Sequence, residues 1–403
     1  MTKSPCDLLV HGASAVFSGE EVLEGDGLVI GRGKVLETGE ASSLRECWNA
    51  RSELDAACGV VAPGFVDAHV HPAFAEGRAG EFNLRSQGAD YQEIAAAGGG
   101  ILSSVRAVRG LSEEELSRKV ADHFRRMRCH GTTACEAKSG YGLTVEEELK
   151  SLRAIAFAAE ATGMEVFPTF LGAHAVPEEH RENPDDWIDE LCDKGLPAVA
   201  ESGLARAADV FIEGIAFNLD RSRRYLEKAK EVGLALRVHA DQFEALGGVE
   251  LAVELGAESV DHLEVLEDRG LEALALGTTF AGLLPAVPHF LGQESDAPAR
   301  RLLAAGVRCF VATDFNPGSC PCPSLPEAAH FARRRLALTA EEALTAITST
   351  AADSLGAGDR KGRLIPGHDA DLVVLDLPDI DHFGYFLGEN PVRTVVMGGV
   401  VQE

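Results

Sequence analysis

Residues 63–71 read PGFVDAHVH, an apolar run that ends in two histidines separated by one residue. In an extended strand, side chains two positions apart share a face, so His69 and His71 point the same way from the end of the strand and can hold one metal ion together. An alternating His-Val-His is equally compatible with a plain polar strand face. The other histidines and a late acidic residue decide between these two interpretations.

Beyond this stretch, residues 60 to about 355 alternate apolar β-like runs with amphipathic helical segments, which is typical of a parallel sheet with helical crossovers. Two helical segments, 112–120 and 144–150, each begin at a good N-cap and carry acidic residues in the first turn. Eight candidate strands predict an α/β fold with a closed (β/α)₈ barrel. These strands are expected to end at His71, Ser139, His174, Glu213, His239, His262, Pro285 and Asp314.

Both ends of the chain differ from this middle, because they carry short apolar runs bounded by turn residues. The runs cover residues 7–12 and 27–36 near the start, and residues 370–376 and 392–401 near the end. Ends of the same character predict one small β-sandwich assembled from both termini. We therefore expect a composite β-domain of residues 1–59 and 360–403, and a barrel of residues 60–359.

Composition and charge narrow the class of protein. The 403 residues, 45% hydrophobic and 25% charged, fit a globular protein with a large core. No run of about 18 apolar residues occurs, and the first residues lack the charged-then-apolar order of a signal peptide, so we expect a cytoplasmic protein. A formal net charge of -27 argues against nucleic acid and anionic membranes as partners, because the overall field repels both. The nine scattered cysteines fit reduced thiols better than a disulfide framework.

The predicted strand ends carry the residues that can do chemistry. Active sites of such barrels lie at the C-terminal ends of the strands, and in this chain five of the thirteen histidines and one aspartate lie at or just before predicted strand ends. A single histidine there is usually satisfied by neighbouring backbone, but five together indicate a site. Neutral imidazoles from His69, His71 and His239, with the carboxylate of Asp314, are donors that Zn²⁺ or Fe²⁺ accept while leaving room for water.

The order of these motifs resembles the metal-dependent amidohydrolase superfamily over nearly the whole chain, and within it the imidazolonepropionase family. One departure from the family pattern follows Pro285, where a Gly is usual and this chain has Ala286, Val287, Pro288 and His289. The family pattern therefore does not predict the shape of the loop near the seventh strand. The resemblance is carried by residues 64–71 (GFVDAHVH), 77–82 (GRAGEF), 97–101 (AGGGI), 138–143 (KSGYGL), 171–174 (LGAH), 239–242 (HADQ), 261–263 (DHL) and 313–319 (TDFNPGS).

The resemblance implies a hydrolase that opens the cyclic amide of 4-imidazolone-5-propionate to N-formimino-L-glutamate in histidine degradation. It implies one divalent ion, zinc or iron, held by His69, His71, His239 and Asp314, with His262 and Asp314 as the groups that move protons. It also implies a homodimer and a small-molecule substrate, with neither nucleic acid nor membrane as a partner. Substrate contacts are expected from Arg78, Tyr141, His174, Gln242, Asn316, Gly318 and Ser319.

Two charged residues have alternative interpretations. Lys138 could bridge two metals as a carbamate, as in some relatives, but an ion pair with Glu136, which shares its strand face, is the expected role beside a single metal. Arg78 is the candidate cation for the substrate carboxylate, since a guanidinium matches two carboxylate oxygens. Its alternative is a surface arginine paired with Glu76 or Glu81.

Two other functions stay open at this point. One is another amidohydrolase of the deaminase or hydantoinase type, which turnover assays would separate. The other is a barrel without catalysis that serves as an assembly module, although the complete set of candidate metal ligands argues against it.

Overall fold

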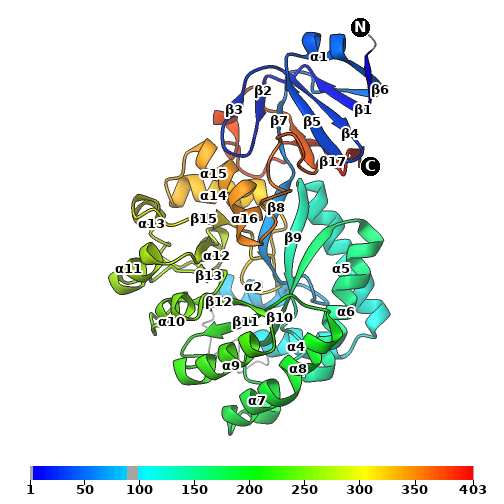
Figure 1. Ribbon diagram of the computed structural model, residues 1–403. Coiled ribbons are helices and arrows are strands. Elements are labelled where there is room, and N and C mark those ends of the chain that lie inside the picture. Colours follow the sequence, from blue (N-terminus) through cyan, green and yellow to red (C-terminus); the bar gives the residue numbers. More distant parts are fainter. Residues whose placement is uncertain (1–2, 89–98, 403) are drawn as a thin grey trace.

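The computed structural model describes residues 3–88 and 99–402 (Figure 1). Residues 97 and 98 of the motif at 97–101 therefore lie outside the described residues. The strands form an eight-stranded parallel sheet, a four-stranded sheet and a six-stranded sheet. The fold is α/β, with a near-closed barrel and smaller mixed sheets that draw on both chain ends, as predicted.

The eight parallel strands follow one another around the sheet in sequence order. Six of them end at or next to the predicted residue, and the last two end slightly earlier, at Leu283 and Val311. Most of their residues are buried, as expected for parallel strands covered by helices, and buried charged residues such as Glu136 and Arg237 lie among the apolar ones. The strands are β8 (Phe65–Val70), β9 (Thr132–Lys138), β10 (Glu165–Ala173), β11 (Ala207–Ile212), β12 (Ala235–Ala240), β13 (Ser259–His262), β14 (Phe280–Leu283) and β15 (Cys309–Val311).

The seam between β8 and β15 is closed by the backbone that follows β15. The amide of Asp314 donates to the carbonyl of His69 at 3.1 Å, and the amide of His71 donates to the carbonyl of Phe315 at 3.0 Å. These bonds flank an isolated parallel bridge between Val70 and Phe315. Barrel closure therefore brings the end of the first strand against Asp314.

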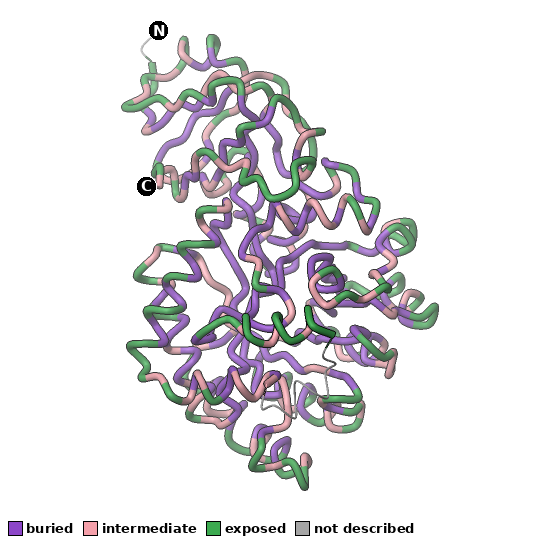
Figure 2. Tube along the Cα trace, turned by 180° about the vertical axis from the view of Figure 1, so that it is seen from behind, coloured by how far each residue is buried: buried purple, intermediate pink, exposed green. Residues whose placement is uncertain are grey.

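Helices surround the strands, and their outward faces are exposed (Figures 1 and 2). The two predicted N-caps are confirmed, because Ser112 accepts from the amide of Glu115 and Thr144 accepts from the amide of Glu147. The helices are α2 (Ala79–Ser86), α4 (Ile101–Arg109), α5 (Glu113–Cys129), α6 (Val145–Thr162), α7 (Pro184–Glu190), α8 (Leu196–Ser202), α9 (Leu219–Glu231), α10 (Gly248–Leu255), α11 (Asp268–Leu276), α12 (Ala286–Leu291), α13 (Ala299–Ala304), α14 (Leu325–Arg335), α15 (Ala340–Ala346) and α16 (Ser349–Ser354), with short turns η1 (Glu178–His180), η2 (Leu191–Gly195) and η3 (Ile380–His382).

Both chain ends lie in a separate β-rich part beside the barrel (Figure 1). Its two sheets have the orders β5-β4-β1-β6 and β18-β17-β16-β7-β2-β3, and residues from both sheets share one apolar core. Strand β7 pairs with β16 from the end of the chain and leads almost directly into β8. The elements are β1 (Ser4–His11), β2 (Ala15–Phe17), β3 (Val22–Leu23), β4 (Gly27–Gly31), β5 (Lys34–Gly39), α1 (Ala41–Cys47), β6 (Trp48–Asp55), β7 (Val60–Pro63), β16 (Leu372–Leu375), β17 (Val392–Met397) and β18 (Val400–Val401).

An ionic cluster joins the start of β10 to the segment that leads into β16. The Nζ atom of Lys361 lies 2.9 Å from Glu165 and 3.3 Å from Asp369, and it also contacts Asp371. Arg360 pairs with Glu165 as well. The barrel and the β-rich part are therefore linked by charge as well as by the chain that passes from β7 into β8. Within residues 3–88 and 99–402, no helix has the length and apolar content needed to cross a membrane.

Candidate active site

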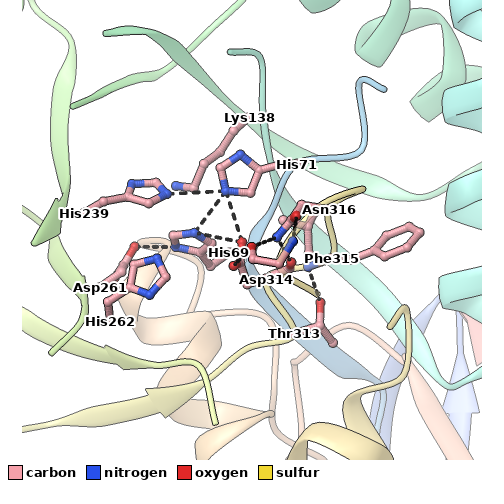
Figure 3. Close-up of polar contacts among 12 residues, drawn as sticks. His69, His71, Lys138, His239, Asp261, His262, Thr313, Asp314, Phe315 and Asn316 are labelled. Atoms are coloured by element: carbon pink, nitrogen blue, oxygen red, sulfur yellow. Dashed lines mark hydrogen bonds and ion pairs between the residues drawn. The ribbon is translucent and has the colours of Figure 1, made fainter. Parts of the chain in front are cut away.

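Three histidines and one aspartate converge at the C-terminal end of the barrel (Figure 3). The Nε2 atoms of His69 and His71 lie 3.2 Å apart, and Nε2 of His239 lies 3.3 Å from that of His71. The Oδ1 atom of Asp314 lies 3.2 Å from Nε2 of His71 and 3.6 Å from Nε2 of His69. All four side chains are buried. The structure thus brings together the four residues expected from the sequence to bind metal.

Two aspartates orient two of these rings. The Nδ1 atom of His69 lies 2.7 Å from Asp261, and Nδ1 of His239 lies 3.0 Å from Asp209. Because an ionised carboxylate only accepts hydrogen bonds, each Nδ1 carries the proton and each Nε2 directs its lone pair toward the shared centre. Sequence reasoning assigned no role to either aspartate. For Asp209 the available signal was an acidic residue inside an otherwise apolar strand, whereas Asp261 lies in a strand that reads SVDH and offers no such contrast.

The electrostatics of this cluster favour a cation. Burial lowers the pKa values of His69 and His71 well below the ordinary range and lowers the pKa of His239 to about 4, so all three rings are neutral near pH 7. Burial raises the pKa of Asp314, and its buried Oδ1 atom accepts no hydrogen bond from the described residues. Three lone pairs and an unpartnered carboxylate oxygen facing one point fit a divalent metal ion. The cluster is a buried His/Asp metal-binding site.

Lys138 lies behind the ligand cluster, in a buried ion pair. Its Nζ atom lies 2.7 Å from Glu136 and 2.7 Å from Asp209. Burial lowers the pKa of Lys138, but the two carboxylates outweigh this effect and the net pKa is raised, so the lysine is charged. The predicted pairing with Glu136 is confirmed, and Asp209 is a second partner that sequence reasoning did not identify.

His262 ends β13 next to the ligand cluster. One of its nitrogens lies within 4.8 Å of ring nitrogens of His69 and His239. Its Nδ1 atom lies 3.4 Å from Glu264. Burial lowers the pKa of His262, but the Glu264 carboxylate outweighs burial and the net pKa is raised. This ring can therefore carry a proton more readily than the three ligand candidates.

A cavity of about 590 Å³ opens above the cluster. His69 is fully buried and does not line it, whereas the other candidate ligands do. Arg85 lines the cavity as well and was not singled out from the sequence. The remaining predicted site residues all line this cavity: Arg78, Tyr141, His174, Gln242, His262, Asn316, Gly318 and Ser319.

Arg78 lies at the cavity wall against Gly318. A methyl group at Gly318 would lie 1.1 Å from Nη2 of Arg78, so only glycine leaves room for the guanidinium. The Nη1 atom of Arg78 also lies 3.6 Å from Glu81. Of the two interpretations drawn from the sequence, the structure contains features of both: the arginine faces the cavity and has Glu81 beside it.

The comparisons with known proteins agree with this geometry. The profile of the amidohydrolase family matches residues 60–401. This chain belongs to the amidohydrolase family. It is 50% identical over 337 residues to the imidazolonepropionase of Rubrobacter xylanophilus, covering 84% of this chain and 80% of the relative. It is 42% identical over 405 residues to the imidazolonepropionase of Herpetosiphon aurantiacus, covering 98% and 95%.

Solved structures of two deaminases share the fold. An adenosine deaminase from Xanthomonas campestris with bound zinc superposes with a TM-score of 0.73 at 18% identity, covering 99% of this chain and 93% of the deaminase. The guanine deaminase of E. coli gives a TM-score of 0.71 at 16% identity, covering 98% of each chain. Identities this low establish the common architecture and nothing about substrate.

The loop after β15 is shaped by Asn316. Its Oδ1 atom accepts from the amides of Gly318 and Ser319, at 2.7 and 2.8 Å. Its Nδ2 atom donates to the carbonyl of Asp314 and to Oγ of Ser319, both at 2.7 Å. The amide of Asn316 thus holds the loop that places Gly318 beside the arginine of the cavity.

The departure from the family pattern after Pro285 forms a short helix. Pro285 caps α12, and Ala286, Val287 and Pro288 are buried in it. His289 stacks on Phe331 of α14 with ring centroids 4.5 Å apart. The cavity is lined by Leu291, the last residue of this helix, and by Gln293 just beyond it, so the departure lies beside the cavity wall and away from the ligand cluster.

Proposed function

We propose that this amidohydrolase is an imidazolonepropionase, which hydrolyses the cyclic amide of 4-imidazolone-5-propionate to N-formimino-L-glutamate in L-histidine degradation. The observation that carries the proposal is the identity of 42% and 50% to two imidazolonepropionases over most of the chain. The cavity supports the proposal, because the guanidinium of Arg78 lies on its wall and the candidate metal ligands lie at its floor.

We infer that one divalent ion, zinc or iron, is held by His69, His71, His239 and Asp314. Three neutral imidazoles and one carboxylate suit either metal. A single ion is favoured because Lys138 is fully engaged by two carboxylates as a charged ammonium. When bound, such an ion polarises a carbonyl group and lowers the pKa of water from about 15.7 to about 7.

The proton transfers are assigned to two residues at the cluster. Asp314 takes a proton from the water whose oxygen bonds to the ring carbonyl carbon. His262 then gives a proton to the ring nitrogen as the carbonyl C–N bond breaks, so that the nitrogen leaves as a neutral amidine. The raised pKa of His262 supports this role, because a more basic imidazole holds its proton near neutral pH.

The propionate of the substrate is recognised away from the cluster. Arg78 supplies two parallel N–H donors for the carboxylate, which the net charge of -27 would otherwise repel. Gly318 supports this assignment by leaving room for the guanidinium. The other predicted contacts around substrate and product are Tyr141, His174, Gln242, Asn316 and Ser319.

The test is turnover of imidazolonepropionate by the purified protein, followed by loss of the ring chromophore, before and after chelation and on return of zinc or iron. Cytosine, guanine and hydantoin serve as substrates for the other amidohydrolase activities. Turnover of one of these three compounds but not of imidazolonepropionate would contradict the proposal and assign the protein the corresponding amidohydrolase activity. A protein that binds no metal and turns over none of them would be an assembly module.

We also propose that residues 60–359 form the barrel domain and that residues 1–59 and 360–403 form the β-domain, with β7 as the connection between them. We propose in addition that the enzyme is a cytoplasmic homodimer. Light scattering of the purified protein measures the oligomeric state directly.

A further inference from the structure

Glu148, in the first turn of α6, holds the loop that forms one wall of the cavity. Its side chain is fully buried. One carboxylate oxygen accepts from the amide of Gly140 at 2.7 Å. The other accepts from the amides of Gly142 and Leu143, at 2.7 and 2.8 Å. Three backbone amides of the loop at residues 139–143 therefore converge on a single carboxylate.

Arg109, at the end of α4, holds the same loop through its carbonyl groups. It donates from Nε to the carbonyl of Gly142 at 2.7 Å and from Nη2 to that of Leu143 at 2.9 Å. Leu143 has a φ of +51°, which is costly for a residue with a side chain and persists only where surrounding contacts impose it, whereas Gly140 adopts its φ of +113° without that cost because it has no Cβ atom. The loop is thus held at its amides by an anion and at its carbonyls by a cation.

This loop positions two cavity residues at once. Tyr141 is part of it and lines the cavity. The carbonyl of Gly140 lies 2.9 Å from Nδ1 of His174. A carbonyl can only accept, so Nδ1 of His174 carries the hydrogen, and its Nε2 is left as a hydrogen-bond acceptor. The orientation and the tautomer of His174 therefore depend on where Gly140 is placed.

We propose that Glu148 is a positioning residue for the reaction, acting through Gly140 and the loop on Tyr141 and His174. The inference rests on the proposed function for its substrate and goes beyond it, because Glu148 does not line the cavity. The contacts form a chain from Glu148 to the cavity. The amide of Gly140 donates to the Glu148 carboxylate, the carbonyl of Gly140 accepts from Nδ1 of His174, and His174 lines the cavity.

Only a carboxylate satisfies this arrangement. Glutamine at position 148 would offer one acceptor oxygen and would turn an NH₂ group toward at least one backbone N–H. At least one buried amide would lose its partner, and the loop would move to recover it. Aspartate is one methylene shorter and would not reach all three amides.

The experiment is a double-mutant cycle on kcat/KM for imidazolonepropionate, using Glu148→Gln, His174→Ala and the double variant. We expect Glu148→Gln to lower kcat/KM on the order of 10- to 100-fold, largely through KM, with metal content unchanged. In the double variant, Glu148→Gln should add far less than it does alone, because the residue it positions is already gone. Reductions that multiply would overturn the proposal.

The matched control is Ser151→Ala, in the same helix, which removes a buried hydroxyl bonded to the carbonyl of Glu147 at 2.9 Å without touching the loop. Its effect should be small and should multiply with that of His174→Ala. If Glu148→Gln does not fold, Arg109→Met releases the loop from the other side and should show the same non-additivity with His174→Ala. Multiplying effects in that cycle would count equally against the proposal.

A second measurement does not depend on the substrate. Spectra of protein labelled with ¹⁵N-histidine report which ring nitrogen is protonated, and His174→Ala identifies the signal of His174. We expect the Nδ1–H tautomer in the parent and a mixture in Glu148→Gln. An unchanged tautomer would refute the positioning role, whereas absence of imidazolonepropionate turnover in the parent with the expected tautomer shift would refute only the proposed function.

Discussion

The Nζ atom of Lys138 lies 2.7 Å from Oδ2 of Asp209, and both side chains are fully buried. The other oxygen of Asp209 is the atom that faces Nδ1 of His239. A lysine whose hydrogen bonds go to Glu136 and Asp209 thus balances the charge of the carboxylate that orients His239. The arrangement of the candidate metal ligands therefore depends on Lys138 behind them as well as on the ligands themselves.

Lys138→Met should destabilise the fold and weaken metal binding together. The substitution leaves Glu136 and Asp209 without their buried cation, and breaking a buried pair in this way costs about 3–5 kcal/mol. Urea unfolding and metal analysis of the purified variant measure the two effects. The exposed Lys119→Met is the control and should change neither. Full metal content with unchanged stability in Lys138→Met would show that the pair has no supporting role.

Asp314→Ala should lose metal and turnover while the barrel stays folded. The amide that closes the barrel seam is retained in alanine, although a φ of +50° at this position adds a backbone cost of about 1–2 kcal/mol. Circular dichroism checks the fold, and metal analysis with the turnover assay checks the site. Asp314→Asn separates the loss of charge from the loss of shape. If the variant kept a full equivalent of metal and a near-parental rate, Asp314 would not be a metal ligand.

His262→Asn should keep the metal ion and lose roughly 10²- to 10⁴-fold in kcat, the usual span for a general acid or base. Asparagine retains a polar side chain of similar reach but cannot exchange a proton near neutral pH. Metal content and single-substrate kinetics measure the two quantities. Loss of the ion in this variant would reclassify His262 as a ligand.

Gly318→Ala should reproduce the defect of Arg78→Met. The new methyl group would occupy the place of the Arg78 guanidinium and displace it from the cavity wall. Both variants should keep metal and lose about 10²- to 10³-fold in kcat/KM, the effect of removing a charge-assisted bidentate contact, and Arg78→Lys should recover part of the loss. A ring substrate that lacks the propionate should be nearly indifferent to all three changes. An equal loss for both substrates would mean that the arginine shapes the loop instead.

Acid should weaken the contact between the barrel and the β-rich part. Burial raises the pKa of Glu165, but hydrogen bonds from Arg360 and Lys361 outweigh it, and the net pKa lies below the ordinary value of 4.5. The stability from this group is therefore fully present above that value and is lost as pH falls through the lower folded pKa. Urea midpoints of the parent and of Glu165→Gln should differ at neutral pH and converge as the pH falls through the lowered folded pKa of Glu165. A gap that is independent of pH would assign the effect to packing.

The barrel and the convergence of the four candidate ligands could be predicted because both follow from local signals. Apolar runs mark the strands, and the ends of parallel strands meet at one edge of the sheet, so His69, His239 and Asp314 had to approach each other once the barrel was inferred. The arginine of the cavity wall was predicted from substrate charge.

The supporting residues could not be predicted in the same way. Asp261 reaches His69 across 192 positions of sequence and Asp209 reaches His239 across 30, and these pairings depend on strand register. Glu148 looks like an ordinary first-turn acid, and only the path of the loop beside it reveals its three backbone partners. Local patterns identify which strands carry ligands, whereas the contacts that fix ring orientation emerge from tertiary packing.

The seam at Asp314 also has a consequence for biosynthesis. A nascent chain carries His69 early, but the carboxylate opposite it and the carbonyl of Phe315 that completes the seam are made some 245 residues later, the difference between positions 314 and 69. The six-stranded sheet likewise needs β16 to β18, which follow the barrel strands in the sequence. The full set of candidate ligands therefore cannot come together until Asp314 has been made and the seam beside it can close.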